Sequence, residues 1–364
     1  PDGTSTETLA WPNGWSDAVL PDGVQQSRLA APDPRFGMQM PLTAFFLSTT
    51  PEGLETTFTH ERFPTPGMGG TLAGQVDART INGRPYSSTY EAASSSVTHV
   101  TPELRESLVE IDGQGRTRRI DIPGLHPLRI AYDGAGRLST IKHGPEPDTA
   151  ATRITSFAYK VTADPRNGYL DTITDPADRV TSFDYDAAGR VIERILPGGR
   201  VVSFGYDPAG NTTAVTPPGR PAHLFQYTAV NLEELYSPPN PPLAAGVGYG
   251  YNLDRQLELI TRPDATSVVF MYDGGGRLDL TTLPGGETLD YEYNPQGRLE
   301  SIDASSGSRA DLGFTYDGSL LRTESWSGGE LAAASVTRGY DDDLRVESLQ
   351  VAGQAPVSFA YDDD

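Results

Sequence analysis

The sequence predicts an all-β chain, built as a long antiparallel strip of hairpins. Gly and Pro account for 39 and 30 of its 364 residues, a share of turn formers too high for a helical protein. Tyrosines recur at a nearly fixed spacing along most of the chain, and an aromatic residue stands two positions before most of them. No stretch shows the strong 3.6-residue periodicity of an amphipathic helix.

The tyrosine spacing defines a unit of about 21 residues that repeats from residue 81 to residue 364. A fixed period of this length is typical of stacked supersecondary units, each of which contacts only its neighbours. We therefore expect the repeat array in residues 81–364, and divergent β-structure that begins or caps it in residues 1–80. The repeat tyrosines are Tyr132, Tyr159, Tyr185, Tyr206, Tyr227, Tyr251, Tyr272, Tyr293, Tyr316, Tyr340 and Tyr361.

Each unit is expected to hold two antiparallel strands and two turns. Residues i and i+2 of a strand point to the same face, so each tyrosine and the aromatic residue before it should share a buried face. Stacked units would then form a ladder of neighbouring rings. A twisted sheet of this many strands cannot stay flat, so the strip should curl or spiral.

The turn after each tyrosine has its own signature. Asp suits the first position of a type I turn, where its carboxylate accepts backbone N–H groups, and Gly supplies the positive φ at the exit. This pattern predicts a hairpin with a bulge. The turn residues are Asp133 and Gly136, Asp186 and Gly189, Asp207 and Gly210, Asp273 and Gly276, and Gly297 in the unit of Tyr293.

The less regular segments carry weaker signals. Residues 9–24 and 79–91 contain Asp-Gly or Asn-Gly pairs and should be hairpins, whereas "AAPDPRFGMQMP" (30–41) should be a proline-broken loop. The insertions 142–152 and 235–245 should be surface loops. The second insertion is Pro-rich and extended, and is either a contact segment or a spacer.

Composition excludes several classes of function. A net charge of −21 disfavours nucleic acid and anionic membranes as partners. The absence of cysteine excludes disulfides, thiolate metal sites and cysteine nucleophiles. No apolar run is long enough for a transmembrane helix. The chain starts at "PDGTSTETLA" and stops at "YDDD", part-way through a repeat, so we expect both ends to be cuts from a longer polypeptide.

Clustered carboxylates are the main candidates for chemistry. Asp184 and Asp186 stand two apart, a spacing that would suit an inverting glycosidase. However, Asp186 is a turn residue with equivalents along the array, and a catalyst needs one tuned site. The acidic runs 341–343 and 362–364 could hold Ca²⁺, but consecutive residues point in different directions. We expect no catalytic residue, no metal ligand and no cofactor.

The other polar candidates also have structural interpretations. None of the histidines forms an H-x-x-x-H pair, and no P-loop, nucleophile elbow or dinucleotide motif follows a strand. An arginine often follows the turn glycine, and we expect it to pair with acids of a neighbouring row or to cover rings. The histidines are His60, His99, His126, His143 and His223, and the arginines are Arg116, Arg137, Arg190, Arg277 and Arg298.

The quoted repeats resemble a known family. "YDGAGRLSTI" (132–141), "YDAAGRVIERI" (185–195) and "YDGGGRLDLTTLPGGETLDYEYNPQGRLESI" (272–302) are similar to the YD (tyrosine-aspartate) repeat of the Rhs family. That family includes bacterial polymorphic toxins, the cocoon subunits of insecticidal toxin complexes, and teneurins. The resemblance implies that this spiralling strip forms part of a large hollow β-shell.

The resemblance also implies a role. In toxin members the shell encloses a C-terminal toxin, which an aspartate-dependent cleavage at a D-P-x-G stretch releases. "DPAG" at 207–210 has these letters but lies inside an ordinary repeat, so we interpret it as a turn. The resemblance therefore predicts a non-catalytic shell segment of a secreted or cell-surface protein. Its expected partner is the rest of the parent polypeptide, such as an enclosed toxin. The alternative is an extracellular adhesion module that binds a carbohydrate or a protein at the cell surface.

Overall fold

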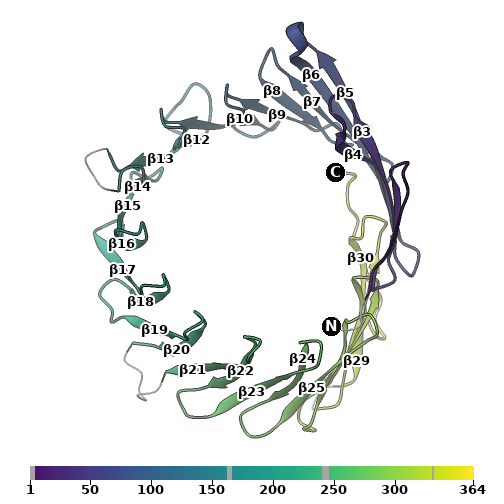
Figure 1. Cartoon of the computed structure of the whole chain (residues 1–364), viewed down its shortest axis with the longest axis vertical. Helices are drawn as coiled ribbons and strands as arrows, with labels where there is room; N and C mark the ends of the chain where they lie inside the picture. The colour runs from purple at the N-terminus through teal and green to yellow at the C-terminus, as the bar shows by residue number, and fades with distance from the viewer. Residues whose placement is uncertain (1–4, 162–165, 240–245, 330–331) are drawn as a thin grey trace. The chain divides into compact units, whose positions relative to one another are not determined.

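The chain folds into antiparallel β-strands connected by short turns. The computed structural model describes residues 5–161, 166–239, 246–329 and 332–364. These residues form 31 strands, assigned to one antiparallel sheet, and one short 3₁₀ helix, η1 (Met68–Gly70). Strands that follow one another in sequence pair with one another (Figure 1). The predicted all-β fold class is confirmed. No helix among the described segments is long and apolar enough to span a membrane.

The strands belong to two compact units, whose boundaries fall inside strands β9 and β23. Unit 1 comprises residues 1–110 and 270–364, and unit 2 comprises residues 111–269. The strands of the first part of unit 1 are β1 (Glu7–Ala10), β2 (Trp15–Val19), β3 (Gln25–Asp33), β4 (Gly37–Thr49), β5 (Glu55–Pro66), β6 (Leu72–Ile81), β7 (Arg84–Glu91), β8 (Ser96–Val100) and β9 (Glu106–Ile111). Those of its second part are β23 (Ser267–Tyr272), β24 (Leu278–Thr282), β25 (Thr288–Tyr293), β26 (Leu299–Ala304), β27 (Asp311–Asp317), β28 (Leu320–Ser327), β29 (Ala334–Tyr340), β30 (Val346–Val351) and β31 (Val357–Ser358).

Unit 2 lies entirely within the repeat array. Its strands are β10 (Thr117–Asp121), β11 (Leu128–Tyr132), β12 (Leu138–His143), β13 (Arg153–Tyr159), β14 (Leu170–Thr174), β15 (Val180–Tyr185), β16 (Val191–Leu196), β17 (Arg200–Tyr206), β18 (Thr212–Thr216), β19 (His223–Tyr227), β20 (Glu233–Ser237), β21 (Val247–Tyr251) and β22 (Leu257–Thr261). The predicted division of the chain at residue 80 stays a prediction.

The turn between β15 and β16 shows how the repeat motif shapes the backbone. The Gly189 N–H donates to the Asp186 carbonyl at 3.1 Å, and the Asp186 N–H donates to the Arg190 carbonyl at 2.9 Å. Gly189 has a φ of +83°, and the strand register shifts at Tyr185. This geometry is a type I turn that ends in a bulge, as the D-x-x-G pattern indicates. The positive φ needed at the exit explains the recurrent glycine.

The strand faces are less deeply buried than predicted. Only Val24 and Val268 are buried hydrophobic residues among the described segments, and the repeat tyrosines are mostly half-buried. Strands contact mainly their neighbours in sequence, so each ring is covered by side chains of adjacent hairpins. The strand face that the repeat rings share is therefore only half-buried.

Two of the predicted loops differ from the structure. Residues 30–41 belong largely to β3 and β4, and the strand register shifts around Pro32. A proline cannot donate to a ladder, but it is tolerated at a bulge, which is why it does not break the hairpin. Residues 235–237 belong to β20, and the rest of the predicted 235–245 loop lies largely outside the described residues.

Candidate functional site

Several hairpins are tied to the next by three side chains, which we call the Asp–Arg–Tyr clasp. In the clasp of Asp186, one carboxylate oxygen accepts the Arg190 N–H at 3.0 Å and the other accepts the Arg190 Nε–H at 2.7 Å. The Arg190 guanidinium lies over the ring of Tyr206, 4.6 Å from its centroid. The Tyr206 hydroxyl donates back to the Val191 carbonyl at 2.8 Å. One hairpin thus contacts the tyrosine of the next hairpin twice, through the guanidinium on the ring face and through the carbonyl that accepts the hydroxyl hydrogen.

The same arrangement recurs in both units. In every copy the aspartate and arginine belong to one turn and the tyrosine follows in the next unit, where it ends a strand in all copies except that of Tyr361, which lies beyond β31. The other clasps are Asp112–Arg116–Tyr132, Asp133–Arg137–Tyr159, Asp273–Arg277–Tyr293 and Asp341–Arg345–Tyr361, with guanidinium-to-ring distances of 4.1, 4.2, 4.5 and 4.4 Å. Arg298 lies 5.6 Å from the ring centroid of Tyr316, but it pairs with Asp22.

The clasp confirms the expectation that the arginines cover rings, and it corrects two other expectations from the sequence. The acid paired with the arginine belongs to the arginine's own turn, not to a neighbouring row. The predicted ladder of rings is also wrong at the clasps, because a guanidinium lies on the tyrosine face that a preceding ring would occupy. Tyr185 shows the exception: the ring of Tyr169 takes the place of the arginine, with 5.0 Å between the ring centroids.

Four clasp carboxylates, those of Asp112, Asp133, Asp186 and Asp273, have lowered pKa values, which favours their ionised form. Hydrogen bonds from the Arg190 backbone and side chain lower the pKa of Asp186, and the Arg137 side chain lowers the pKa of Asp133. A general acid in a glycosidase needs a raised pKa, which this environment opposes. Asp186 lies in the turn beyond β15, while Asp184 lies within β15 and pairs with Arg166.

Three consecutive turns in unit 2 lack the clasp arginine. The residue after the turn is Asn211, Leu232 or Gln256 in place of arginine. Tyr227 and Tyr251 still donate their hydroxyl hydrogens, to Thr212 and Glu233 carbonyls at 2.9 Å. Asp207, the aspartate of "DPAG", caps its turn by accepting the Asn211 N–H at 2.9 Å.

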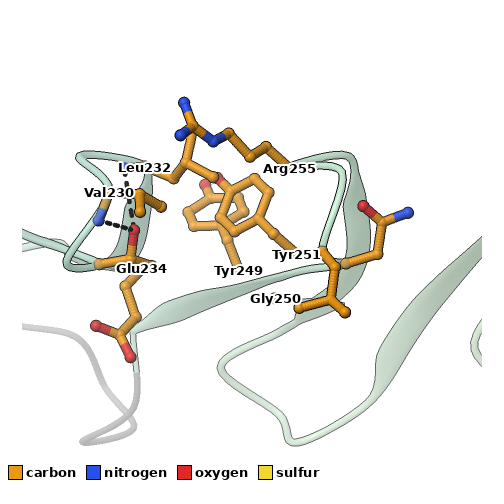
Figure 2. A pocket seen from close by; sticks show the side chains of 10 residues that line it. Val230, Leu232, Glu234, Tyr249, Gly250, Tyr251 and Arg255 are labelled. Atoms are coloured by element: carbon orange, nitrogen blue, oxygen red, sulfur yellow. Dashed lines mark hydrogen bonds between the residues drawn. The ribbon is translucent and has the colours of Figure 1, made fainter.

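Unit 2 also contains two cavities, the first of which is lined by Leu232, where a clasp arginine is missing. One, of about 490 Å³, lies between the turns 228–232 and 252–256 and is lined by Leu232, Tyr249, Tyr251 and Arg255 (Figure 2). The other, of about 500 Å³, is lined by aromatic residues that include Phe225 and Tyr236. Tyr249 lines both cavities, so they adjoin one another.

Unit 1 contains a second recurrent arrangement, which we call the turn seam. Turns from its first part contact turns from its second part, and the Thr56 hydroxyl of β5 donates to the Asp342 carbonyl in the turn between β29 and β30 at 2.9 Å. Asp317 is fully buried there, and accepts the Thr50 hydroxyl at 2.6 Å and the Glu52 N–H at 2.8 Å. Arg298 pairs with Asp22 at 2.6 Å in the same way.

The acidic runs considered for calcium belong to this seam. Asp343 pairs with Arg84 and with Arg345, and Asp362 and Asp364 pair with Arg105. The Asp342 carbonyl accepts an N–H of the Asn82 side chain at 2.8 Å. The carboxylates of these runs are therefore paired with arginine side chains of the protein, and the Asp342 carbonyl is bonded to an N–H donor. Sequence reasoning missed the seam, because its partners are more than 250 residues apart and carry no local signal.

A buried charge network lies across β3, β5 and β6, and sequence reasoning missed it too. Arg62 donates to Asp77 at 2.6 Å and to Asp33 at 2.8 Å, and His60 lies 2.9 Å from Asp77. Burial raises the pKa of Asp77, but hydrogen bonds from Arg62, His60 and Gln75 outweigh it and lower the pKa to about 2.

The histidines are dispersed over the described strands and turns. His99 bonds Ser88 at 2.8 Å, His143 bonds Arg153, His223 bonds Tyr236 at 2.7 Å, and His126 is exposed between β10 and β11. Within the described ranges, no three His, Asp or Glu side chains group so that they could hold a metal ion.

Comparison with known proteins identifies the fold. The profile of the teneurin YD-shell family matches residues 75–364. The chain belongs to the teneurin YD-shell family. No curated protein sequence matches the chain. Membership of the YD-shell family supports a structural shell role for the clasped hairpins.

The fold is similar to that of a solved structure from a toxin complex. The crystal structure of TcdB2–TccC3–Cdc42 is 14% identical, with a TM-score of 0.50, over 96% of this chain and 21% of that chain. A Photorhabdus luminescens Tc holotoxin pore structure is 14% identical, with a TM-score of 0.48, over 95% of this chain and 22% of that chain. The chain therefore spans about a fifth of the length of these structures.

Proposed function

We propose that the chain is a non-catalytic segment of a secreted or cell-surface YD shell that encloses or scaffolds another polypeptide. The observation that carries this proposal is the Asp–Arg–Tyr clasp. It recurs from hairpin to hairpin and uses its charged groups for cohesion. A catalyst would concentrate polar groups in one place, whereas here equivalent groups are spread along the strip.

The chemistry of the clasp supports a wall-forming role. Each clasp aspartate is paired with its arginine, each guanidinium is stacked on a ring, and the tyrosine hydroxyl donates to the backbone. Such groups stabilise the contact between hairpins and leave no free acid, base or nucleophile at the turn. The acidic net charge of −21 would also repel nucleic acid and anionic membranes.

A second candidate function is an extracellular module that binds a ligand. The specific observation in its favour is the pair of adjoining cavities in unit 2, where the clasp series is interrupted. A shell that encloses a polypeptide could also carry such a site, so the two functions are compatible.

Enclosure is tested by limited proteolysis of the longer polypeptide that we expect to carry this chain. Cleavage sites are mapped by mass spectrometry in the wild type and in the Arg137→Gln, Arg190→Gln double variant. If the shell encloses another segment, that segment resists cleavage until the clasps are weakened. Equal cleavage of that segment in both proteins would contradict enclosure. An Arg179→Gln variant, which breaks an exposed ion pair with Asp175, is the control.

A further inference from the structure

A row of three cations crosses adjacent strands of unit 2. Arg119 of β10 stands opposite Arg129 of β11, and Arg129 stands opposite Lys142 of β12. Side chains directly opposite one another in antiparallel strands have Cβ atoms about 4.5–5.5 Å apart, and like charges at such positions repel. Composition does not explain the cluster, because the chain has only 28 Lys and Arg residues against 49 Asp and Glu residues. The row therefore needs counter-charges close by.

The insertion that follows β12 supplies these counter-charges. Glu146 pairs with Arg119 at one end of the row. Asp148 pairs with the other two cations, with Arg129 at 2.6 Å and with Lys142 at 2.5 Å. Every cation of the row thus contacts a carboxylate of the same short segment.

We call this segment, residues 144–152, the acidic strap. Its two ends meet at a neck: Gly144 is buried, and a Cβ atom at this position would lie 2.6 Å from the Thr152 Cα atom. Glycine permits this close approach because it has no side chain. Beyond the neck, the Pro145 carbonyl accepts an N–H group of the Arg129 guanidinium at 3.1 Å. The strap is therefore a closed loop anchored on the central cation of the row.

The ion pairs of the strap are open to solvent. The Glu146 and Asp148 side chains are 50% and 37% exposed, and a hydrogen bond from Lys142 lowers the pKa of Asp148. Isolated ion pairs with this exposure contribute little and are screened by salt. These two carboxylates also cancel repulsion within the row, which increases their effect. Asp121 pairs with Arg119 at 2.6 Å as well, so the other two cations depend most on the strap.

We propose that the acidic strap is a charge-controlled cover, held closed over the cation row by Glu146 and Asp148 and released when salt screens their attraction. Release leaves Arg119, Arg129 and Lys142 to repel one another, so opening of the strap also loosens the pairing of β10, β11 and β12. The strap thus makes this part of unit 2 responsive to ionic strength. The inference goes beyond the proposed shell role and does not depend on enclosure.

The test follows the mobility of the strap. The chain has no cysteine, so a nitroxide spin label on Ala150→Cys, an exposed position, reports on the strap alone. We expect an immobilised resonance spectrum at about 0.1 M NaCl and a mobile one at about 1 M, because the screening length falls from about 10 Å to about 3 Å. The strap variant, Glu146→Gln with Asp148→Asn, should be mobile at both concentrations. Glu193→Gln with Glu258→Gln, which removes the same charge from exposed positions of β16 and β22, should follow the wild type.

A second measurement separates release of the strap from loss of the fold. Hydrogen exchange of β10, β11 and β12 should accelerate at least about threefold in the strap variant, because the row is no longer neutralised. Exchange in β19 to β22 should stay at the wild-type rate. Adding Arg129→Gln removes the central cation, so exchange in β10 to β12 should return towards the wild-type rate.

Two results would overturn the proposal. One is a label whose mobility is the same at low and high salt, or the same in the strap variant and the wild type. The other is an Arg129→Gln substitution that adds to the acceleration of exchange instead of reversing it. Neither result affects the protease-protection test of enclosure.

Discussion

The guanidinium of Arg190 lies 4.6 Å from the ring centroid of Tyr206, a residue of the next hairpin, while its Nε–H is bonded to Asp186 in its own turn. One side chain therefore joins the local turn to the neighbouring unit. Because the same relationship recurs along both units, the cohesion of the strip depends on many equivalent cation–aromatic contacts.

Replacing Arg190 should destabilise the chain more than replacing an arginine that has only an ion pair. Arg190→Gln removes both the ion pair and the stacking on Tyr206, and should cost about 1 kcal/mol of unfolding free energy. Arg179→Gln removes a salt bridge whose arginine side chain is 67% exposed, and should cost well under about 0.5 kcal/mol. Urea unfolding of the two variants measures the difference, and equal losses would contradict a role for the stacking.

The turn aspartates should tolerate Asn better than Ala. Asn294 occupies the same turn position, and its side-chain oxygen accepts the Gln296 and Arg298 N–H groups at 3.1 and 3.0 Å. Asp133→Asn should therefore keep the turn and lose only the ion pair with Arg137, whereas Asp133→Ala loses both. We expect thermal midpoints in the order wild type, Asn, Ala. An Asn variant as unstable as the Ala variant would show that the ion pair dominates.

The turn seam should depend on Asp317 more than on other acids of unit 1. Asp317→Ala leaves the buried Thr50 hydroxyl without its acceptor, at a cost of about 1–3 kcal/mol, and also removes the acceptor of the Glu52 N–H. Hydrogen exchange at Glu52 should accelerate in this variant. Asp342→Ala is the matched control, because the Asp342 side chain is exposed and the seam uses its carbonyl. Similar exchange in both variants would argue against the buried contact.

The charge network around Asp77 should make unit 1 sensitive to acid. The folded pKa of Asp77, about 2, lies below the ordinary aspartate value of 3.8, so the unfolded chain binds the proton first as pH falls. The stabilisation, about 2 kcal/mol, is complete above about pH 4 and is lost as the pH falls towards 2. Asp77→Asn should be less stable at pH 7 and should lack this part of the pH dependence.

Denaturant midpoints between pH 7 and pH 2 measure the effect. The Asp77 carboxylate is bonded to the side chains of His60, Arg62 and Gln75, and Asp33 lies beside it. The Asp33 carboxylate also has a lowered pKa. Burial raises the pKa of Asp33, but hydrogen bonds from Arg35, Arg62 and Phe36 outweigh it. If Asp77→Asn follows the wild-type curve below pH 4, Asp33 and not Asp77 carries the acid sensitivity.

Local features of the fold were readable from the sequence. The D-x-x-G turns, the strand before each repeat tyrosine and the hairpin at Asn82 follow from backbone preferences of a few adjacent residues. The interruption of the arginine series at Asn211, Leu232 and Gln256 was also present in the sequence. It becomes informative only once the role of the arginine is known.

The sequence by itself determined the strand-and-turn repeat, because turn chemistry and two-residue alternation act over short distances. Only the tertiary structure decided which groups meet across hairpins: that Arg190 covers Tyr206, that Asp317 is buried against Thr50, and that the rings of unit 2 line cavities. The physical reason is that these contacts depend on strand register and on the close approach of segments up to 286 residues apart, which no local pattern specifies.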